Sequence, residues 1–580
     1  RRLKPSRHPM SPAGNHRQPG PLAQLLQTGT PAELRRERLR WQLALPRARR
    51  RLRQAEQNHT ADLAPLFAAL PAGNPDAGEQ LLARDNPAET PHDFLHLHDL
   101  AAQASPEARQ YARASVQHWI QNTPRSAAHA PWLPEVAARR ILSWCLAWPF
   151  FGASGNLNFR RATLAALKTQ GDWLAEVAPA GLRGQPALAQ HIAALLARLM
   201  EQNPEHAQDP VFDARLAALT DSLAAELGDD GSIPERQPSA LLDLWSDLTH
   251  LRLALRRCAR TREAELLEPR IAAVADALAA LSHGAAGLAL FHGARAERRR
   301  LANLRGRLPQ RPPSRSVMGF ERLQAGGVRV IADCAAAAPP AVASGRYHLA
   351  PAALEVSVDG ERLVTGCGTV DTAPWTQALR QTAAHSCLGF SAGERELAPG
   401  EFAGRRLWYG VAAETEYGNV RLERREHEHA VELVYGHRAW RRHGQTYSER
   451  SLRLHDDGAR LFGRERLHAE RPCSFALRFH LAPEIDSHPA RDRRSALLRT
   501  RGGDLWRLRI DSEHGGNSDG DSDSAGGGDG NDSDVVFERE ESVVSLEGTP
   551  ERSTQWVARG TTSTRREAAL LWSLTREKNA

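Results

Sequence analysis

The chain has 580 residues, of which 41% are hydrophobic and 25% are charged. This length exceeds one domain of about 100 to 200 residues, and the composition excludes a wholly disordered protein. A net charge of +7 is small for such a length, so we expect no nucleic-acid partner. We also expect no transmembrane segment, because no apolar run reaches the about 20 residues that a membrane helix needs. No secretory signal is visible after Arg1.

The first half of the chain has a helical hydrophobic period. Residues 1–30 are rich in Pro, Arg and Gly without any period, which predicts a disordered basic lead. From residue 31 to residue 310, apolar residues recur at spacings of three and four, as on one face of a helix. A clear stripe consists of Leu241, Leu244, Leu248, Leu251 and Leu255. We therefore expect an all-helical domain over residues 31–310.

After the proline-rich segment 308–313, the hydrophobic period changes to two, which is typical of strands. Val328–Asp333 is one predicted strand, and an Asp-Gly turn at 359–360 predicts a hairpin. This half is predicted to be an antiparallel β-sandwich over residues 315–580. Within it, the Gly, Ser, Asp and Asn tract 514–534 predicts a disordered insertion. The expected fold class is multidomain, α then β.

Several short strings occur in one order along both halves. They are segments 230–238, 287–293, 319–323, 366–369, 382–386 and 478–483. In this order they resemble the heparinase II/III-like family of polysaccharide lyases. The resemblance implies an incomplete (α/α) toroid followed by a β-sandwich, with an acidic polysaccharide bound in the cleft between them.

The resemblance also implies a reaction, β-elimination at a uronic acid. A base removes the C5 proton, a hydrogen-bonding or cationic group neutralises the adjacent carboxylate, and an acid protonates the leaving C4 oxygen. Family members commonly use Asn, Tyr and His side chains for these tasks. The predicted partner is thus an acidic polysaccharide such as a glycosaminoglycan or alginate.

The helical half departs from the family pattern at two positions. Segment 184–186 reads Gly-Gln-Pro where lyases have Gly-Asn-His, so Gln185 takes the place of the amide that contacts the substrate. The usual tyrosine position falls on Ala240. Glu235 and Arg236 are expected to open a helix at the loop facing the cleft, where we interpret both as substrate-binding residues.

The β half supplies the remaining candidates. Arg346, Tyr347 and His348 match a His-x-His-x-Asp string of the family, and we interpret them as catalytic residues. Arginine can neutralise a uronate by a two-point contact, and Tyr347 or His348 can serve as the base. His437 matches the first residue of another family string and is a further candidate for substrate binding.

Some family members hold a structural metal on the β domain. Here His348 and His385 match two of the ligand positions, whereas the aspartate positions are occupied by Ala350 and Gly366. Because a structural zinc site needs about four ligands, we expect no metal and no other cofactor, with the two histidines as the remaining candidates.

Three functions are compatible with the sequence. The first is an active bacterial lyase, which the resemblance favours. The second is a catalytically inactive carbohydrate-binding protein that keeps the lyase fold, which Ala240 and Arg346 favour. The third is a basic protein that holds an anionic surface through the arginines of segment 35–53. Family members act in the cell envelope or periplasm, so we expect that location, while the missing signal leaves the cytoplasm open.

Overall fold

The computed structural model describes residues 73–84, 86–123, 130–177, 183–201, 209–304, 316–335, 348, 350–370, 375–392, 395–396, 421–438, 445–469, 473–512, 535–562 and 567–577. The predicted basic lead (1–30), the arginine-rich segment 35–53, the proline-rich segment 308–313 and the predicted insertion 514–534 lie outside these residues.

Helices make up the described part of the first half. They are α3 (Pro75–Arg84), α4 (His96–Gln103), α5 (Pro106–Asn122), α6 (Pro134–Phe151), α7 (Leu157–Val177), α8 (Gly184–Leu199), α9 (Pro210–Glu226), α10 (Pro238–Arg257), α11 (Thr261–Glu265), α12 (Glu268–Ala280) and α13 (Arg298–Leu304). Several start in the way their sequence predicts, because proline occupies the first turn and a polar side chain caps it. Ser105 caps α5 and Asp209 caps α9.

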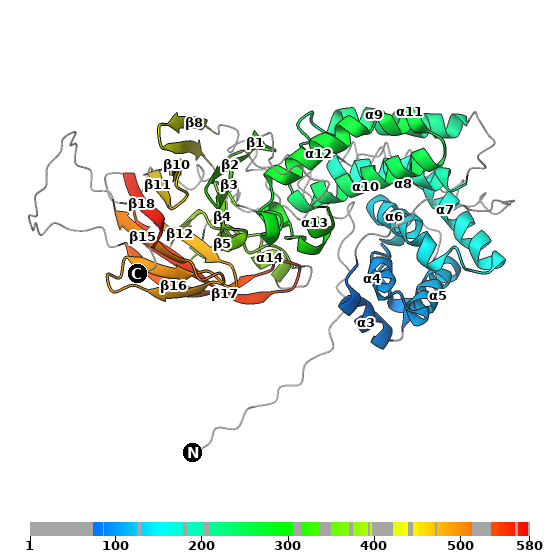
Figure 1. Ribbon diagram of the computed structural model, residues 1–580, viewed down its shortest axis with the longest axis horizontal. Coiled ribbons are helices and arrows are strands. Elements are labelled where there is room, and N and C mark those ends of the chain that lie inside the picture. Colours follow the sequence, from blue (N-terminus) through cyan, green and yellow to red (C-terminus); the bar gives the residue numbers. More distant parts are fainter. Residues whose placement is uncertain are drawn as a thin grey trace, which may run out of the picture.

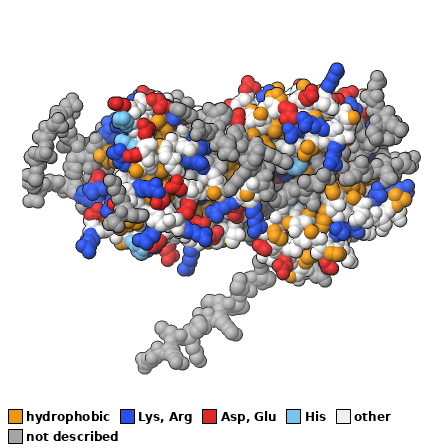
Figure 2. Space-filling model, viewed as in Figure 1, with side chains coloured by type: hydrophobic (Ala, Val, Ile, Leu, Met, Phe, Trp, Pro, Cys, Tyr) orange, Lys and Arg blue, Asp and Glu red, His pale blue; other side chains and the backbone are white. Residues whose placement is uncertain are grey.

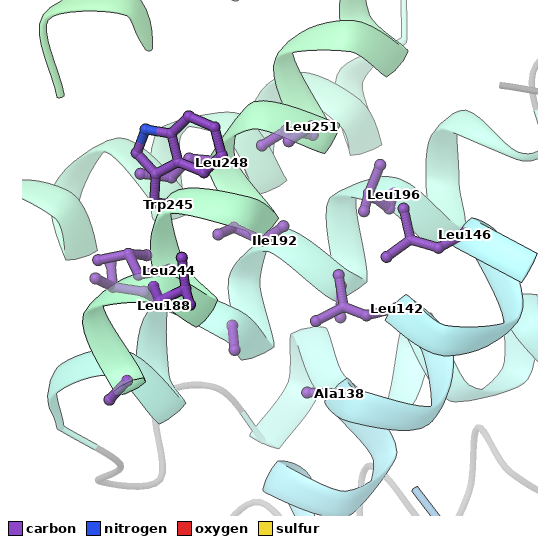
Figure 3. Packing of buried hydrophobic residues seen from close by; sticks show 14 of the residues in the cluster. Ala138, Leu142, Leu146, Leu188, Ile192, Leu196, Leu244, Trp245, Leu248 and Leu251 are labelled. Carbon is purple, nitrogen blue, oxygen red and sulfur yellow. The ribbon is translucent and has the colours of Figure 1, made fainter. Parts of the chain in front are cut away.

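Packing of α6, α8 and α10 forms the centre of the helical core. Each contributes apolar residues at four-residue or three-residue steps, which point toward one another in Figure 3. They include Ala138, Leu142, Leu146, Leu188, Ile192, Leu196, Leu244, Leu248 and Leu251. Most of these side chains are fully buried, so the stripe read from the sequence on α10 is the face that the helix turns inward.

The second half consists of two antiparallel sheets. In the described residues, one has the order β1-β2-β3-β4-β5-β12-β17-β16, with β6 also paired with β12 and β7 paired with β6. The other has the order β13-β14-β15-β18-β11-β10-β9-β8. The strands of the first are β1 (Ser316–Val317), β2 (Phe320–Ala325), β3 (Val328–Asp333), β4 (Leu354–Val358), β5 (Glu361–Thr365), β6 (Leu388–Ala392), β7 (Arg395–Glu396), β12 (Ser474–Leu481), β16 (Val536–Val544) and β17 (Glu551–Thr561).

The strands of the second sheet are β8 (Arg421–His427), β9 (Ala430–His437), β10 (Gln445–His455), β11 (Arg460–Ala469), β13 (Asp486–Pro489), β14 (Ser495–Arg499), β15 (Leu505–Ser512) and β18 (Glu567–Arg576). A short helix, α14 (Trp375–Ala378), lies between β5 and β6 in the chain. Apolar residues of both sheets form one buried cluster, in which the rings of Phe479 (β12) and Trp572 (β18) are 5.1 Å apart. The two sheets therefore pack face to face as a sandwich.

Figure 1 shows the helices on one side of the molecule and the sandwich on the other, with the sheet that contains β2 to β5 nearer the helices. Arginines of this sheet bind the helical half. The Arg322 guanidinium donates hydrogen bonds to the carbonyls of Ala279 and Ala280 at the end of α12, at 2.7 and 3.1 Å. These buried contacts join the two domains.

The surface carries mixed charge, and Figure 2 shows blue and red side chains interspersed over both domains on the visible face. None of the described helices is long and apolar enough to cross a membrane.

The structure confirms the predicted fold class, α followed by an antiparallel sandwich. It confirms the Val328–Asp333 strand with its predicted bounds, and the Asp359-Gly360 turn joins β4 to β5 with both residues at positive φ, 48° and 84°. One local prediction was wrong. Glu235 and Arg236 do not open a helix, because Arg236 has a φ of 54° and α10 begins at Pro238, where proline fits the first turn.

Candidate functional site

The first turn of α8 is held by carboxylates from elsewhere in the chain. Its N-cap residue, Arg183, makes no side-chain cap. Instead, the Gly184 N–H donates to Glu226 Oε2 at 2.7 Å, and the Gln185 N–H donates to Glu235 Oε1 at 2.6 Å. Gly184 has a φ of 63°, and a Cβ added there would collide with the Glu235 carboxylate. Glycine is therefore required for the close approach that brings Gln185 and Glu235 together.

Gln185 and Glu235 both keep a polar atom without a hydrogen-bond partner. The Gln185 side chain is only 6% exposed, yet its Nε2 is unpaired, and so is the Glu235 Oε2. Burial is the main reason that the pKa of Glu235 rises to about 7, with a smaller rise from the charge of Glu226. The site thus presents an amide donor beside a carboxyl group that changes charge near neutral pH.

Arg236 contacts the β domain instead of facing solvent. Its Nε donates to the Met318 carbonyl at 2.7 Å, its Nη2 is ion-paired with Asp333, and its guanidinium lies 4.7 Å from the centre of the Phe320 ring. These contacts explain the positive φ of Arg236, because the turn aims its side chain at the sandwich. A substrate contact by Arg236 stays a prediction.

His292 is a site residue that we did not predict. Its Nε2 lies 3.1 Å from Asp333 Oδ2, its Nδ1 lies 3.4 Å from the His348 carbonyl, and its own carbonyl accepts a 2.9 Å hydrogen bond from Gln237 Nε2. It occupies the variable position of the Phe-x-Gly string at 291–293. The string indicated that the segment resembles the family, but it did not indicate a role for the histidine within it.

His348 lies in this group through its backbone, and its ring lies 5.3 Å from the ring of His385. Both imidazoles are buried, with His348 Nδ1 and His385 Nε2 unpaired. Burial lowers the pKa of His348 well below its ordinary value and that of His385 to about 3, so both are neutral at physiological pH.

These histidines do not fit the structural metal of some family members. The described residues contain no group of three or more His, Cys, Asp or Glu that could hold a metal ion. Gly366 stands near the pair without a ligand atom, since a Cβ there would lie 3.4 Å from His385 Nδ1. The neighbouring Glu355 carboxylate is already occupied by Arg362, His283 and two backbone N–H groups.

The remaining candidates divide into two groups. Arg346 and Tyr347 lie outside the described residues. His437 is buried near the end of β9, where burial and then the charge of Arg450 lower its pKa to about 3.

The tyrosines that the structure describes do not replace the missing phenol, because each hydroxyl donates elsewhere: Tyr111 to Asn86, Tyr435 to Ala352 and Tyr447 to Glu449.

Comparisons with known proteins concern the chain as a whole and its fold. Residues 308–573 match a sequence model described as heparinase II/III-like, C-terminal. The chain is also similar to FtsZ-localized protein C of Caulobacter vibrioides, with 29% identity over 440 residues, covering 73% of this chain and 74% of that protein.

Two solved structures share the whole fold. A heparinase III has a TM-score of 0.64 at 11% identity, covering 96% of this chain and 94% of its own. The heparan sulfate lyase HepC from Pedobacter heparinus has a TM-score of 0.53 at 12% identity, covering 96% and 93%. At such identities, the likeness concerns the fold alone.

Proposed function

We propose that this chain is a polysaccharide lyase that cleaves an acidic polysaccharide by β-elimination, since residues 308–573 match the heparinase II/III-like C-terminal model and the chain shares the fold of a heparinase III. The observation that supports this most is the pairing of Gln185 with Glu235 at the start of α8. The reaction needs a donor for the uronate carboxylate and a group that exchanges a proton near neutral pH, and these two side chains supply both.

In the proposed reaction, Gln185 Nε2 donates a hydrogen bond to the uronate carboxylate and stabilises the charge that develops as the C5 proton leaves. The ionised Glu235 takes this proton. The C4–O bond then breaks as the C4=C5 double bond forms, and Glu235 returns the proton to the leaving oxygen. Glu235 ends in its starting form, so one carboxyl group does the work of the phenol that the family places at Ala240.

The test is an ultraviolet absorbance assay for the unsaturated uronate product, with heparin, heparan, alginate and chondroitin as substrates. We expect product from one of them, and a loss of about 100-fold or more in kcat for Gln185→Ala, as for removal of one oxyanion donor. Glu235→Gln removes the proton carrier and is expected to abolish turnover. Matched controls are Gln117→Ala and Glu107→Gln, two exposed positions on α5, which should keep full activity.

A second candidate function is a binding protein that keeps the lyase fold without turnover. Two observations favour it: a relative is named for localisation with FtsZ, and Arg236 is engaged inside the protein. This candidate predicts retention of the chain on one of the four polysaccharides with no unsaturated product at any pH. It also predicts that a fluorescent fusion lies where FtsZ lies. Product formation by the wild type, lost in Gln185→Ala, would reject it.

We also propose that the protein acts in the cell envelope or periplasm, because its proposed substrate is a polysaccharide. Cell fractionation of the native source tests this location. Recovery of the protein with the cytosolic fraction alone would contradict it and favour the second candidate.

A further inference from the structure

Two carboxylates share the first turn of α8 but have different surroundings. Glu226 ends α9, and Glu235 lies in the loop before α10, so two separate segments converge on Gly184 and Gln185. Both Glu226 oxygens are occupied: Oε2 accepts from Gly184, and Oε1 accepts a 2.6 Å hydrogen bond from Arg183 Nε. Glu235 has one occupied oxygen and one unpaired oxygen.

We propose that Glu226 is a positioning residue of this site, which fixes the Gly184–Gln185 turn and places its carboxylate near the Glu235 carboxyl group. This inference deepens the proposed function and rests on it for the role of the proton. Glu226 holds the turn through its hydrogen bonds to Arg183 and Gly184, whereas Glu235 exchanges the proton.

The contacts of the two carboxyl groups support these different roles. Glu226 is only 7% exposed and has the partners that stabilise an ionised carboxylate, a guanidinium and a backbone N–H at a helix N-terminus. Glu235 receives N–H groups on one oxygen only and has no cationic partner among the described residues. A fixed negative charge nearby disfavours a second one, which acts in the same direction as burial.

The charged groups that face Glu235 are few. Glu226 from α9 is the one that acts on its pKa, whereas Arg183 is 51% exposed and engaged with Glu226. Arg236, although adjacent in sequence, directs its guanidinium to Asp333. The Gln185 N–H and the N–H of Glu235 itself oppose the rise in pKa. Removing the Glu226 charge should therefore leave Glu235 easier to ionise.

A purely structural role, capping α8, would also explain where Glu226 lies. Glu226→Gln separates the two roles, because the amide oxygen can still accept the Gly184 N–H while the charge is lost. Glu226→Asp does the opposite, since it keeps the charge and shortens the reach to the helix. Arg183→Gln is a third variant with the opposite sign, because it leaves the Glu226 charge uncompensated.

The experiment measures the protonation midpoint of Glu235 without relying on activity. The wild type and each variant are prepared with and without Glu235→Gln, and the free energy of unfolding in urea is measured from pH 4 to pH 9. The pH at which the difference between the two members of a pair levels off gives the protonation midpoint of Glu235 in the folded chain. We expect Glu226→Gln to lower the midpoint, Arg183→Gln to raise it, and Glu226→Asp to leave it near the wild-type value. Glu107→Gln, at the start of α5, should not move it.

An unchanged midpoint in both Glu226→Gln and Arg183→Gln would overturn the inference and leave Glu226 as a helix cap. If Glu226→Gln does not fold, the exposed Arg183 position still decides the question. Where product forms, the acid limb of the pH–rate profile should shift with the midpoint in each variant. A wild type that forms no product at any pH would refute the proposed lyase activity, while the midpoint series would still test the pairing.

Discussion

At the scale of single residues, the raised pKa of Glu235 has a consequence for stability. An isolated glutamate has a pKa of 4.5, and burial raises that of Glu235 to about 7. Between these values the unfolded chain is ionised while the folded chain still binds the proton, so Glu235 lowers stability progressively as pH rises through this window. Glu235→Gln has no such titration. We therefore expect the variant to gain about 3 kcal/mol over the wild type between pH 4 and pH 8.

Urea denaturation at the two pH values measures this gain. The exposed Glu107→Gln serves as the control, and its stability difference from the wild type should stay constant with pH. A pH-independent difference for Glu235→Gln would mean that the carboxyl group is ionised throughout.

The ion pair between Arg236 and Asp333 gives a second prediction at this scale. Both side chains are buried, and His292 is the other side-chain partner that Asp333 has in the contacts described above. Arg236→Met leaves a buried carboxylate without its cation, which typically costs about 3 to 5 kcal/mol. Urea denaturation measures the loss. Arg270→Met is the control, because its partner Asp229 is fully exposed and such pairs contribute little.

Only part of this site could be predicted from the identity of its residues. Gln185 was predicted because it stands in a recognisable Gly-Gln-Pro string. The titration of Glu235 could not be predicted, since it arises from burial against segments about 10 to 50 residues away. His292 was missed for a similar reason, because its partner Asp333 is brought to it by the packing of two domains.

At the scale of elements, the first turn of α8 depends on Gly184. Alanine there would suffer both the positive φ and a collision with the Glu235 carboxylate. Gly503→Ala is a matched control, since Gly503 has a φ of 93° but an added Cβ meets nothing within 4 Å. We expect Gly503→Ala to lower the free energy of unfolding by about 1 kcal/mol, because only the strained backbone conformation contributes. Gly184→Ala should lower it measurably more in urea denaturation. Equal losses would show that the turn relaxes around the new methyl group.

Element boundaries were predicted best where a turn has its own chemistry. The Asp-Gly pair at 359–360 fixed the β4–β5 hairpin, because both residues adopt the positive φ that this turn requires. The start of α10 was misplaced by two to three residues for the converse reason. Arg236 has a positive φ without being glycine, and a tertiary ion pair, which the sequence pattern does not reveal, stabilises it there.

At the scale of the whole molecule, the change of hydrophobic period from about 3.6 to 2 was enough to predict helices followed by a sandwich. The hydrophobic pattern does not predict how the two domains pack against each other. Their contact is partly apolar, as where Phe291 stacks on Phe320 with the ring centres 4.8 Å apart, and partly polar. In the polar part, Arg322 and Arg362 of the sandwich donate to carbonyl groups near the end of the helical half. Each of these hydrogen bonds joins a guanidinium of one domain to a backbone carbonyl of the other, so it depends on both folds. Hydrophobic periodicity therefore does not predict it.

Arg362 is the centre of this contact. It is ion-paired with Glu355 at 2.7 Å, donates to the Ala286 carbonyl at 3.2 Å and also binds the Leu288 carbonyl, while His283 lies 3.1 Å from the same carboxylate. Together these groups tie the segment after α12 to β4 and β5. Because the network is buried, breaking it leaves several groups unpaired in both domains at once.

We therefore predict that the two domains unfold together in the wild type and separately in Arg362→Ala. Scanning calorimetry should show one transition for the wild type and two for the variant. The helical circular dichroism signal of the variant should be lost in one of its two transitions and not in the other. Acid should act in the same direction, because the pairing holds the pKa of Glu355 at about 2 and its contribution is lost as pH falls from 4.5 toward that value. Arg453→Ala, an exposed arginine on β10, should leave the single transition intact. One shared transition in Arg362→Ala at neutral pH would show that apolar contacts alone couple the domains.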